Sequence, residues 1–351
     1  MSKIRIAVLF GGRSGEHDVS VRSAASVLQA LDREKYEVIP IAITREGRWL
    51  SPTESSRLLP AEAQGALSTA AAVVVSREPG STSGADVVFP VLHGTFGEDG
   101  TVQGLLELAN VAYVGAGVLA SAAAMDKDVM KRLFRERRLA AVDYVAFLRD
   151  KRAEMVSEVE QRFGYPMFVK PANLGSSVGI SKARSAADFA AAMELALQFD
   201  RKVVIEAAVP NAREIECAVL GNDSPETSIP GEAIPSREFY DYEAKYLDEG
   251  LRLLIPAPLA DTHVAEIRRM AIGAFRAVDG AGMSRVDFLV ASDTGETFVN
   301  ELNTIPGFTP VSMYPKLWEA SGLPYPALLD RLIALALERH AAKQRLRTSM
   351  T

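Results

Sequence analysis

The stretch that decides the fold runs from residue 285 to residue 303 and reads RVDFLVASDTGETFVNELN. Its two apolar halves predict two strands, and the polar residues between them predict a turn. A symmetric hairpin places Asp287 opposite Glu301 and Arg285 opposite Asn303. Because alternate side chains of a strand share a face, all four project to the same side of the sheet.

Three of these residues, Asp287, Glu301 and Asn303, offer the oxygen ligands that magnesium prefers. A shared carboxylate with an arginine beside it suits one or two Mg²⁺ ions that bridge nucleotide phosphates. The alternative is a solvated hairpin face with a surface salt bridge. The constrained loop at residues 304–309, TIPGFT, favours the metal site because it lies directly beside these ligands.

The first third of the chain has the alternation of an α/β protein with a parallel sheet. Residues 4–10 are an apolar run with the length of a buried strand, too short for the core of a signal peptide. Residues 51–85, rich in Ala, Ser, Thr and Pro, predict a loose, partly helical excursion. Further strands are expected at 36–43, 86–92 and 111–114, and helices at 22–31, 100–110 and 118–138.

The remaining chain predicts two smaller α+β lobes, the first of them built around a Gly/Ser loop at residues 175–179. Strands are expected at 166–170, 180–182, 202–206, 214–220, 228–234, 285–290 and 297–302, and helices at 154–163, 186–199, 261–278 and 324–342. We therefore predict three domains, at residues 1–125, 126–210 and 211–345. The first has a Rossmann-like parallel sheet, and the last carries a polar, aromatic loop at 236–249.

Composition narrows the class of protein. The chain has 351 residues, a net charge of −6 and a hydrophobic content of 48%, which is typical of a soluble globular protein and argues against a nucleic-acid binder. The one cysteine, Cys217, allows no intrachain disulfide, and the four histidines form no zinc pattern. No apolar run approaches the roughly 20 residues of a membrane span. We therefore expect a cytoplasmic enzyme.

Two motifs match other chemistries. Residues 115–120, GAGVLA, match the dinucleotide fingerprint, but a long basic helix follows instead of a strand ending in an acidic residue, which favours a simple tight turn. Residues 175–179, GSSVG, match the nucleophile elbow of hydrolases. That elbow needs a helix after the turn, whereas residues 180–182 predict a returning strand. A flap whose backbone N–H groups bind phosphate is the better interpretation.

Two lysines are candidates for phosphate contacts. Lys170 ends a strand just before the Gly/Ser loop, and Lys127 follows Met125 and Asp126. Either lysine is also compatible with a solvated surface charge. The chain has no P-loop motif, so an ATP site must be of another design.

Eight segments, in order, resemble the D-alanine–D-alanine ligases of bacterial wall synthesis, which have the ATP-grasp fold. The likeness spans nearly the whole chain, and it lies in the order of the segments more than in any one of them. The segments are 11–17 (GGRSGEH), 93–104 (HGTFGEDGTVQG), 125–127 (MDK), 170–179 (KPANLGSSVG), 214–216 (EIE), 240–246 (YDYEAKY), 285–288 (RVDF) and 300–307 (NELNTIPG).

The resemblance implies an ATP site between two lobes. Asp287, Glu301 and Asn303 would bind two Mg²⁺ ions, for which Mn²⁺ can substitute, with Glu301 shared. The residues implied to contact ATP are Lys127, Lys170, Ser176, Glu206, Ala207, Val209, Glu214 and Lys245. Of these, residues 206–209 would form the adenine hinge, although the spacing from Glu206 to Glu214 is about one residue longer than in some relatives.

The resemblance also implies a site for two D-alanine molecules. Glu16 would hold the first ammonium group, Arg285 and the Gly307 N–H the oxyanion, and Ser312 the second carboxylate, with His93 also binding substrate. A hydrogen-bonded set of Glu16, Ser176 and Tyr246 would join three parts of the chain. Lys245, partnered by Glu98, would reach the transferred phosphate from a lid formed by residues 236–249.

Three rival functions are compatible with parts of the sequence. The first is a D-alanine–D-lactate or D-alanine–D-serine ligase, although Lys245 and Tyr246 resemble the dipeptide-forming type. The second is a non-catalytic nucleotide-binding regulator, and the third is an NAD-dependent dehydrogenase that uses residues 115–120. The relatives suggest a homodimer, and the charge and hydropathy of the chain predict no nucleic-acid or membrane partner.

Overall fold

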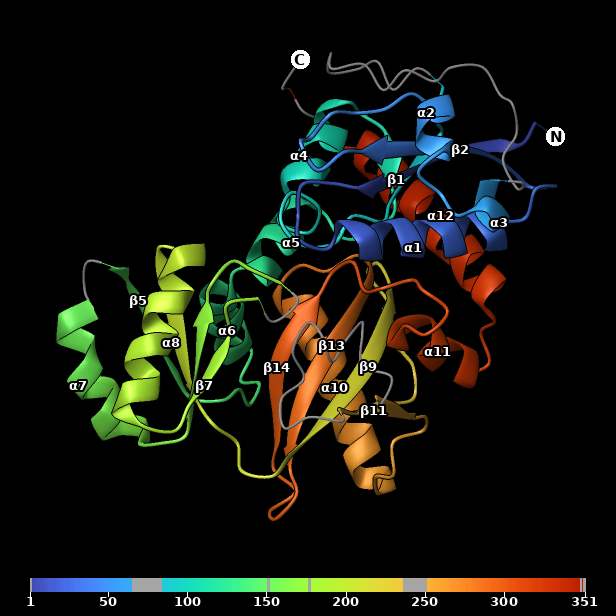
Figure 1. Cartoon of the computed structure of the whole chain (residues 1–351). Coiled ribbons are helices and arrows are strands. Elements are labelled where there is room, and N and C mark those ends of the chain that lie inside the picture. Colours follow the sequence, from blue (N-terminus) through green and yellow to red (C-terminus); the bar gives the residue numbers. More distant parts are fainter. Residues whose placement is uncertain are drawn as a thin grey trace.

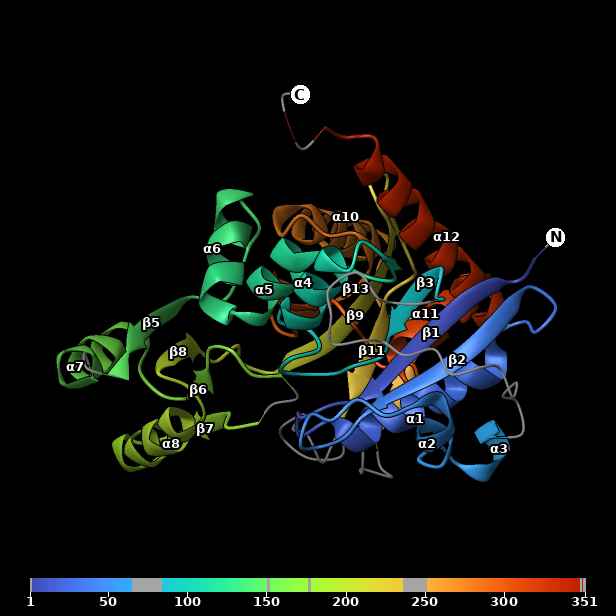
Figure 2. The same ribbon diagram turned by 90° about the horizontal axis from the view of Figure 1, so that it is seen from above.

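The computed structural model describes residues 2–64, 84–149, 152–175, 178–235, 251–347 and 349, with residues 152–157 as backbone only. These parts form three sheets with helices packed against them (Figure 1). Figure 1 shows the N-terminal sheet above the other two, which lie side by side beneath it. Viewed from above, the sheet that carries β5 to β8 stands apart from the rest and is reached through α6 (Figure 2).

The N-terminal sheet is parallel, with the strand order β2-β1-β3-β4. Its strands are β1 (Ile4–Gly11), β2 (Tyr36–Ile43), β3 (Val87–Pro90) and β4 (Ala112–Tyr113). Nearly every residue of β1 is buried, as expected for a parallel strand covered on both faces. The carboxyl ends of these strands point toward the cavity described below, which is where open α/β sheets bind ligands.

The helices of the first part differ from the prediction in two places. They are α1 (His17–Ala30), α2 (Pro52–Ser56), α3 (Ala61–Gln64), α4 (Thr101–Leu108), α5 (Val118–Met125) and α6 (Lys127–Glu136). The predicted single helix at 118–138 is two helices, because Asp126 is extended and its carboxylate accepts from the N–H groups of Asp128 and Val129 as the N-cap of α6. Helix α1 begins five residues earlier than predicted, and its first turn contains two polar residues that are buried, His17 and Ser20. Residues 65–83 of the predicted excursion lie outside the described residues.

The central sheet is antiparallel, with the order β5-β8-β6-β7. Its elements are β5 (Tyr144–Leu148), α7 (Arg152–Phe163), β6 (Met167–Pro171), β7 (Ser181–Ala183), α8 (Ala186–Phe199) and β8 (Lys202–Ala207). The antiparallel pairing of β6 with β7 confirms that the chain returns as a strand after the Gly/Ser loop, so the nucleophile elbow is absent. Strand β5 was not predicted, because a five-residue apolar run does not separate strand from helix.

The C-terminal sheet has the order β12-β11-β9-β13-β14, and β10 pairs with β9. Its elements are β9 (Ala212–Gly221), β10 (Glu226–Thr227), β11 (Gly231–Ile234), β12 (Arg252–Leu254), α10 (Asp261–Ala277), β13 (Gly282–Ala291) and β14 (Thr297–Asn303). The predicted register is confirmed, since Arg285 pairs with Asn303 and Asp287 with Glu301. A bulge directly after Asp287 shifts the remaining pairs by one residue, which a symmetric hairpin did not anticipate.

Two further helices, α11 (Met313–Ala320) and α12 (Tyr325–Gln344), close the chain. Helix α11 was not predicted. Helix α12 packs against the N-terminal sheet, and its buried leucines share one apolar core with β1, β3 and β9 (Figure 1). The last helix of the chain therefore packs against its first part. The division into three domains at residues 1–125, 126–210 and 211–345 stays a prediction.

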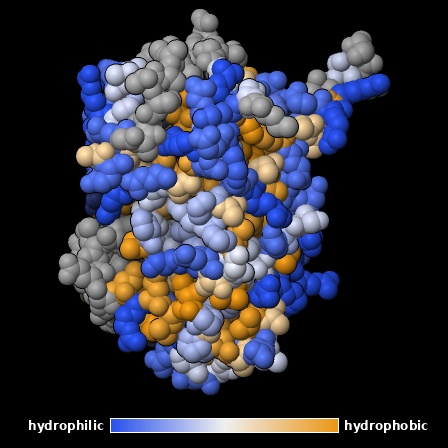
Figure 3. All heavy atoms as spheres, turned by 90° about the vertical axis from the view of Figure 1, so that its right-hand side faces the viewer, coloured by the Kyte–Doolittle hydropathy of each residue, from blue (hydrophilic) through white to orange (hydrophobic). Residues whose placement is uncertain are grey.

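The surface on the side of α11 and α12 is not uniformly polar. Figure 3 shows hydrophobic residues gathered mainly in the lower half of this face. Among the helices that the structure describes, none has the length and apolar character needed to span a bilayer.

Candidate active site

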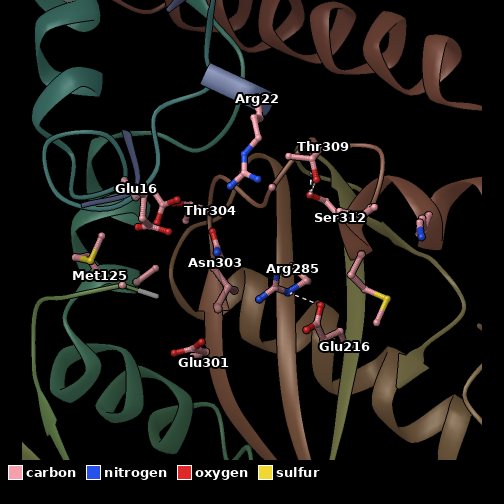
Figure 4. Close-up of a pocket in the computed structure, with 18 of the residues that line it drawn as sticks. Glu16, Arg22, Met125, Glu216, Arg285, Glu301, Asn303, Thr304, Thr309 and Ser312 are labelled. Atoms are coloured by element: carbon pink, nitrogen blue, oxygen red, sulfur yellow. Dashed lines mark hydrogen bonds and ion pairs between the residues drawn. The ribbon is translucent and has the colours of Figure 1, made fainter. Parts of the chain in front are cut away.

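A cavity of about 690 Å³ lies where the three sheets meet (Figure 4). All three parts of the chain contribute to its wall, including Glu16, Lys127, Gly175, Arg285, Glu301 and Gly307. Glu98, Asn303 and Ser312 line it as well, so residues predicted from separate segments of the sequence share one cavity. Sequence positions almost 300 residues apart are therefore brought together.

Arg285 is the electrostatic centre of the C-terminal wall. Its Nε and Nη2 donate to the two carboxylate oxygens of Asp287, both at 2.6 Å. Its Nε also lies 2.8 Å from Oε2 of Glu216, on the neighbouring strand β9 (Figure 4). One guanidinium thus lies between two carboxylates, of which Glu216 is the more deeply buried, with 4% of its side chain exposed against 13% for Asp287.

The predicted metal ligands Asp287, Glu301 and Asn303 lie near this arginine, the last two at the cavity wall. Within the described ranges, no three His, Cys, Asp or Glu side chains come together as a ready metal site. The donor set nevertheless fits magnesium, because two carboxylates and a carboxamide oxygen come from paired positions of one hairpin. Asp287 faces Arg285 in this arrangement, and Asn303 accepts from the Ile305 N–H at 3.1 Å.

His93 and Ser23 contact the loop after β14 through hydrogen bonds. His93 Nδ1 lies 3.0 Å from the Ile305 carbonyl oxygen, and its Nε2 lies 3.1 Å from the Ser23 hydroxyl, which accepts from the Phe308 N–H. The His93 ring is almost fully buried and does not line the cavity. In this structure it contacts the loop, whereas the sequence predicted a contact with substrate.

Glycine is required where this loop meets Ser312. A Cβ at Gly307 would lie 2.7 Å from the Ser312 hydroxyl oxygen, which already accepts from the Thr309 N–H at 3.0 Å. Gly307 and Arg285 both line the cavity. Arg22 of α1, which the sequence did not single out, reaches the same end of the cavity (Figure 4).

A buried acidic pair lies on the N-terminal side. The Glu16 carboxylate fits between two glycines, since a Cβ at Gly94 would come within 2.6 Å of it and one at Gly175 within 3.3 Å. Burial raises the pKa of Glu98 to about 7, against the opposing effect of His93. Burial alone would lower the pKa of His93, but the hydrogen bond and charge of Glu98 outweigh it and raise that pKa.

The two lysines that were predicted to contact phosphate have different partners. Lys127 donates to the Leu174 carbonyl oxygen at 2.6 Å, beside the Gly/Ser loop. Lys170 lies 2.6 Å from the carboxylate of Glu206, whose other oxygen lies 3.1 Å from Lys131. These two lysines hold the pKa of Glu206 at about 2, although burial acts to raise it.

The remaining predicted residues fall into two groups. Ala207, Val209 and Glu214 lie at the end of β8, in the following loop and on β9, and none lines the cavity. Ser176, Lys245 and Tyr246, with the predicted lid at 236–249, lie outside the described residues. Residues 115–117 form a turn that leads into α5 and packs against Gly282, whose Cβ would lie 3.0 Å from the Gly115 Cα, and this supports the tight-turn interpretation.

The chain matches two family models, described as the N-terminus of D-ala D-ala ligase over residues 5–116 and its C-terminus over residues 133–334. The chain belongs to the D-alanine–D-alanine ligase family. It is 54% identical to a D-alanine–D-alanine ligase of Solibacter usitatus, covering 97% of this chain and 98% of the relative, and 51% identical to one of Heliobacterium modesticaldum, covering 98% of both.

Solved structures of the family agree with this fold. A D-alanine–D-alanine ligase from Coxiella burnetii superposes with a TM-score of 0.85 at 38% identity, covering 98% of this chain and 97% of that one. A D-Ala:D-Ser ligase from Enterococcus faecalis gives a TM-score of 0.84 at 37% identity, covering 95% and 100%. The predicted ATP-grasp architecture with an N-terminal parallel sheet is confirmed.

Three residues of the site were missed by reasoning from the sequence. Lys131 is four residues after Lys127 on α6, which is one helical turn, and Glu216 is two residues after Glu214 on β9. Both spacings place the missed residue on the same face as a predicted one. Arg22 carried no signal beyond its place on α1.

Proposed function

We propose that this chain joins two D-alanine molecules into D-alanyl-D-alanine, with ATP converted to ADP and phosphate, as a step in peptidoglycan precursor synthesis. The observation that carries the proposal is the single cavity in which an arginine between two carboxylates faces Glu16, Lys127 and the Gly307 backbone. The full-length match to ligases named for this reaction supports it.

ATP binds between the central and C-terminal lobes in this proposal. Its adenine lies along residues 206–209 and its ribose against Glu214, while Lys127 and Lys170 approach the phosphates. Ser176 and Lys245 complete the contacts. Asp287, Glu301 and Asn303 would hold two Mg²⁺ ions, or Mn²⁺ in their place, which would supply positive charge to the phosphoryl oxygens.

The first D-alanine binds with its ammonium group at Glu16, and its carboxylate attacks the γ-phosphate of ATP. The lysines of the site neutralise the charge that spreads over the transferred phosphoryl group. The resulting acyl phosphate, D-alanyl phosphate, reacts with the amine of the second D-alanine. The carboxylate of this second D-alanine contacts Ser312. Arg285 and the Gly307 N–H stabilise the oxyanion. The carbon–nitrogen bond then forms, the acyl carbon–oxygen bond breaks, and phosphate and the amine proton are released.

Water has to be excluded, because it would hydrolyse the acyl phosphate. The lid at residues 236–249, with Tyr246 hydrogen-bonded to Glu16 and Ser176, serves this purpose in the proposal. His93 contributes to substrate binding through the loop it contacts.

The chain acts in the cytoplasm as a homodimer in this proposal, without a nucleic-acid or membrane partner. Leu108 on α4 and Val118 and Leu119 on the adjoining α5 support a subunit contact, since they are 71%, 40% and 64% exposed. Light scattering distinguishes a dimer from the 37.9 kDa monomer.

The nearest competing function is a ligase for D-serine or D-lactate, because a D-Ala:D-Ser ligase has nearly the same fold. The higher identity to D-alanine–D-alanine ligases favours D-alanine as second substrate. The test is a competition at neutral pH with equimolar D-alanine, D-serine and D-lactate, read by mass spectrometry. We expect D-alanyl-D-alanine as the main product; a preferred ester or mixed dipeptide would overturn the substrate assignment.

A further inference from the structure

Glu206, Lys131 and Lys170 form a buried charged cluster behind the predicted phosphate site. The carboxylate of Glu206 lies between the two ammonium groups, with Oε1 at 3.1 Å from Lys131 and Oε2 at 2.6 Å from Lys170. The exposed fractions of the side chains are 2% for Glu206, 1% for Lys131 and 11% for Lys170. Buried lysines are rare unless they are paired, so the cluster has a specific purpose.

Lys131 stands at the junction of two lobes. It belongs to α6, it lies over the Tyr144 ring of the central sheet at 5.8 Å, and its ammonium group is 3.4 Å from the Asn300 carbonyl oxygen of β14. Asn300 directly precedes Glu301. Lys131 therefore has fixed contacts on both sides of the space in which the proposed nucleotide lies, and it is the least exposed of the three.

Within the cluster two ammonium groups share one carboxylate, and outside it the charge of Glu301 also acts on Lys131. Excess buried charge is costly, and burial lowers the pKa of Lys131 accordingly. An anion that approached the cluster would relieve this cost. Lys170 is the more exposed lysine and lies at the end of the strand before the Gly/Ser loop, so it is the one that can meet such an anion.

We propose that Lys131 is a positioning residue of the nucleotide site: it neutralises Glu206 and so leaves the ammonium group of Lys170 able to turn to a nucleotide phosphate. Without Lys131, Glu206 would have Lys170 as its remaining partner in the cluster and would hold it away from the phosphate. This inference rests on the proposed function, in which Lys170 meets ATP.

The charge of Glu206 makes the proposal testable. If Lys131 acts through Glu206, its removal is harmful only while Glu206 is charged. Calorimetric binding of Mg-ADP is measured for the wild type, Lys131→Met, Glu206→Gln and Lys131→Met/Glu206→Gln, with thermal unfolding as the check of folding. Arg132→Met is the matched control, since Arg132 is next to Lys131 on α6 but 69% exposed.

We expect Lys131→Met to weaken ADP binding by about tenfold or more, the scale of a hydrogen bond to a charged group. Added to Glu206→Gln, the Lys131→Met change should cost little further ADP affinity, and Arg132→Met should bind ADP like the wild type. Unchanged ADP affinity in Lys131→Met, or an equal loss when Lys131→Met is added to Glu206→Gln, would overturn the proposal.

Two further outcomes of this experiment can be distinguished from each other. If Lys131→Met does not fold, the double variant is compared with Glu206→Gln: equal ADP affinity supports the proposal, and a further tenfold loss, by the same scale, overturns it. If the wild type itself binds no ADP, the proposed function fails instead, and with it the nucleotide on which the role of Lys131 depends.

Discussion

Two charged clusters of this molecule are opposite in sign. In the C-terminal sheet, one arginine, Arg285, lies between the carboxylates of Glu216 and Asp287. In the central sheet, one carboxylate, Glu206, lies between the ammonium groups of Lys131 and Lys170. Each cluster is largely buried, and each has one charge more of one sign than of the other.

The difference shows what each cluster can bind. The acidic cluster, with Glu301 beside it, suits a divalent cation, and the basic cluster suits a phosphate. A magnesium–nucleotide complex contains both partners and would fit between the two lobes.

Removing a negative charge beside the acidic cluster should have the largest effect on turnover. Glu301→Gln is expected to lower turnover by at least ~10²-fold, on the scale of losing a key electrostatic group of an active site. Steady-state kinetics at saturating ATP measure it. Glu296→Gln, exposed in the turn of the same hairpin, is the control and should be unaffected. Retained activity in Glu301→Gln would contradict the metal assignment.

A smaller effect is expected from Glu216→Gln. With its partner on β9 neutral, Arg285 would attach more firmly to Asp287 and compete with magnesium there. We expect a fall in kcat of about tenfold and a higher magnesium concentration for half-maximal rate, as for one charged hydrogen bond. Glu226→Gln on the exposed β10 is the matched control. An unchanged magnesium requirement would show that Glu216 does not act through Arg285.

The smallest effect concerns stability on the N-terminal side. The pKa of Glu98 is raised to about 7 by burial, so its stabilising contribution is present below its ordinary pKa and is lost as pH rises through 7. The pKa of His93 is also raised, so its contribution to stability likewise falls as the pH rises. Between about pH 5.5 and 8, the wild type should lose on the order of 2 kcal/mol more than Glu98→Gln. Thermal unfolding at both pH values measures this difference, and parallel behaviour of the two proteins would contradict it.

The sequence predicted the parts of this picture that depend on local pattern. The pairing of Arg285 with Asn303 followed from a hairpin of near-equal arms, and β2 and α8 were predicted with their observed bounds. The order of motifs identified the family, which the comparisons confirm.

Non-local contacts were not predictable in this way. Lys131 contacts Glu206, 75 residues along the chain, and only the tertiary fold brings them together. The sequence predicted no role for Glu216, because its position near Arg285 depends on the pairing of β9 with β13. The substrate contact of His93 stays a prediction; in the structure its ring nitrogens lie near Ile305 of the loop after β14 and Ser23 of α1.

The most direct test of the account is phosphate release from ATP and magnesium with D-alanine, with L-alanine and with no amino acid, and the product identified by mass. The account predicts release with D-alanine only, together with D-alanyl-D-alanine. No release with D-alanine from a folded chain that binds ATP would contradict the proposed reaction and would direct the search to other carboxylate and amine substrates.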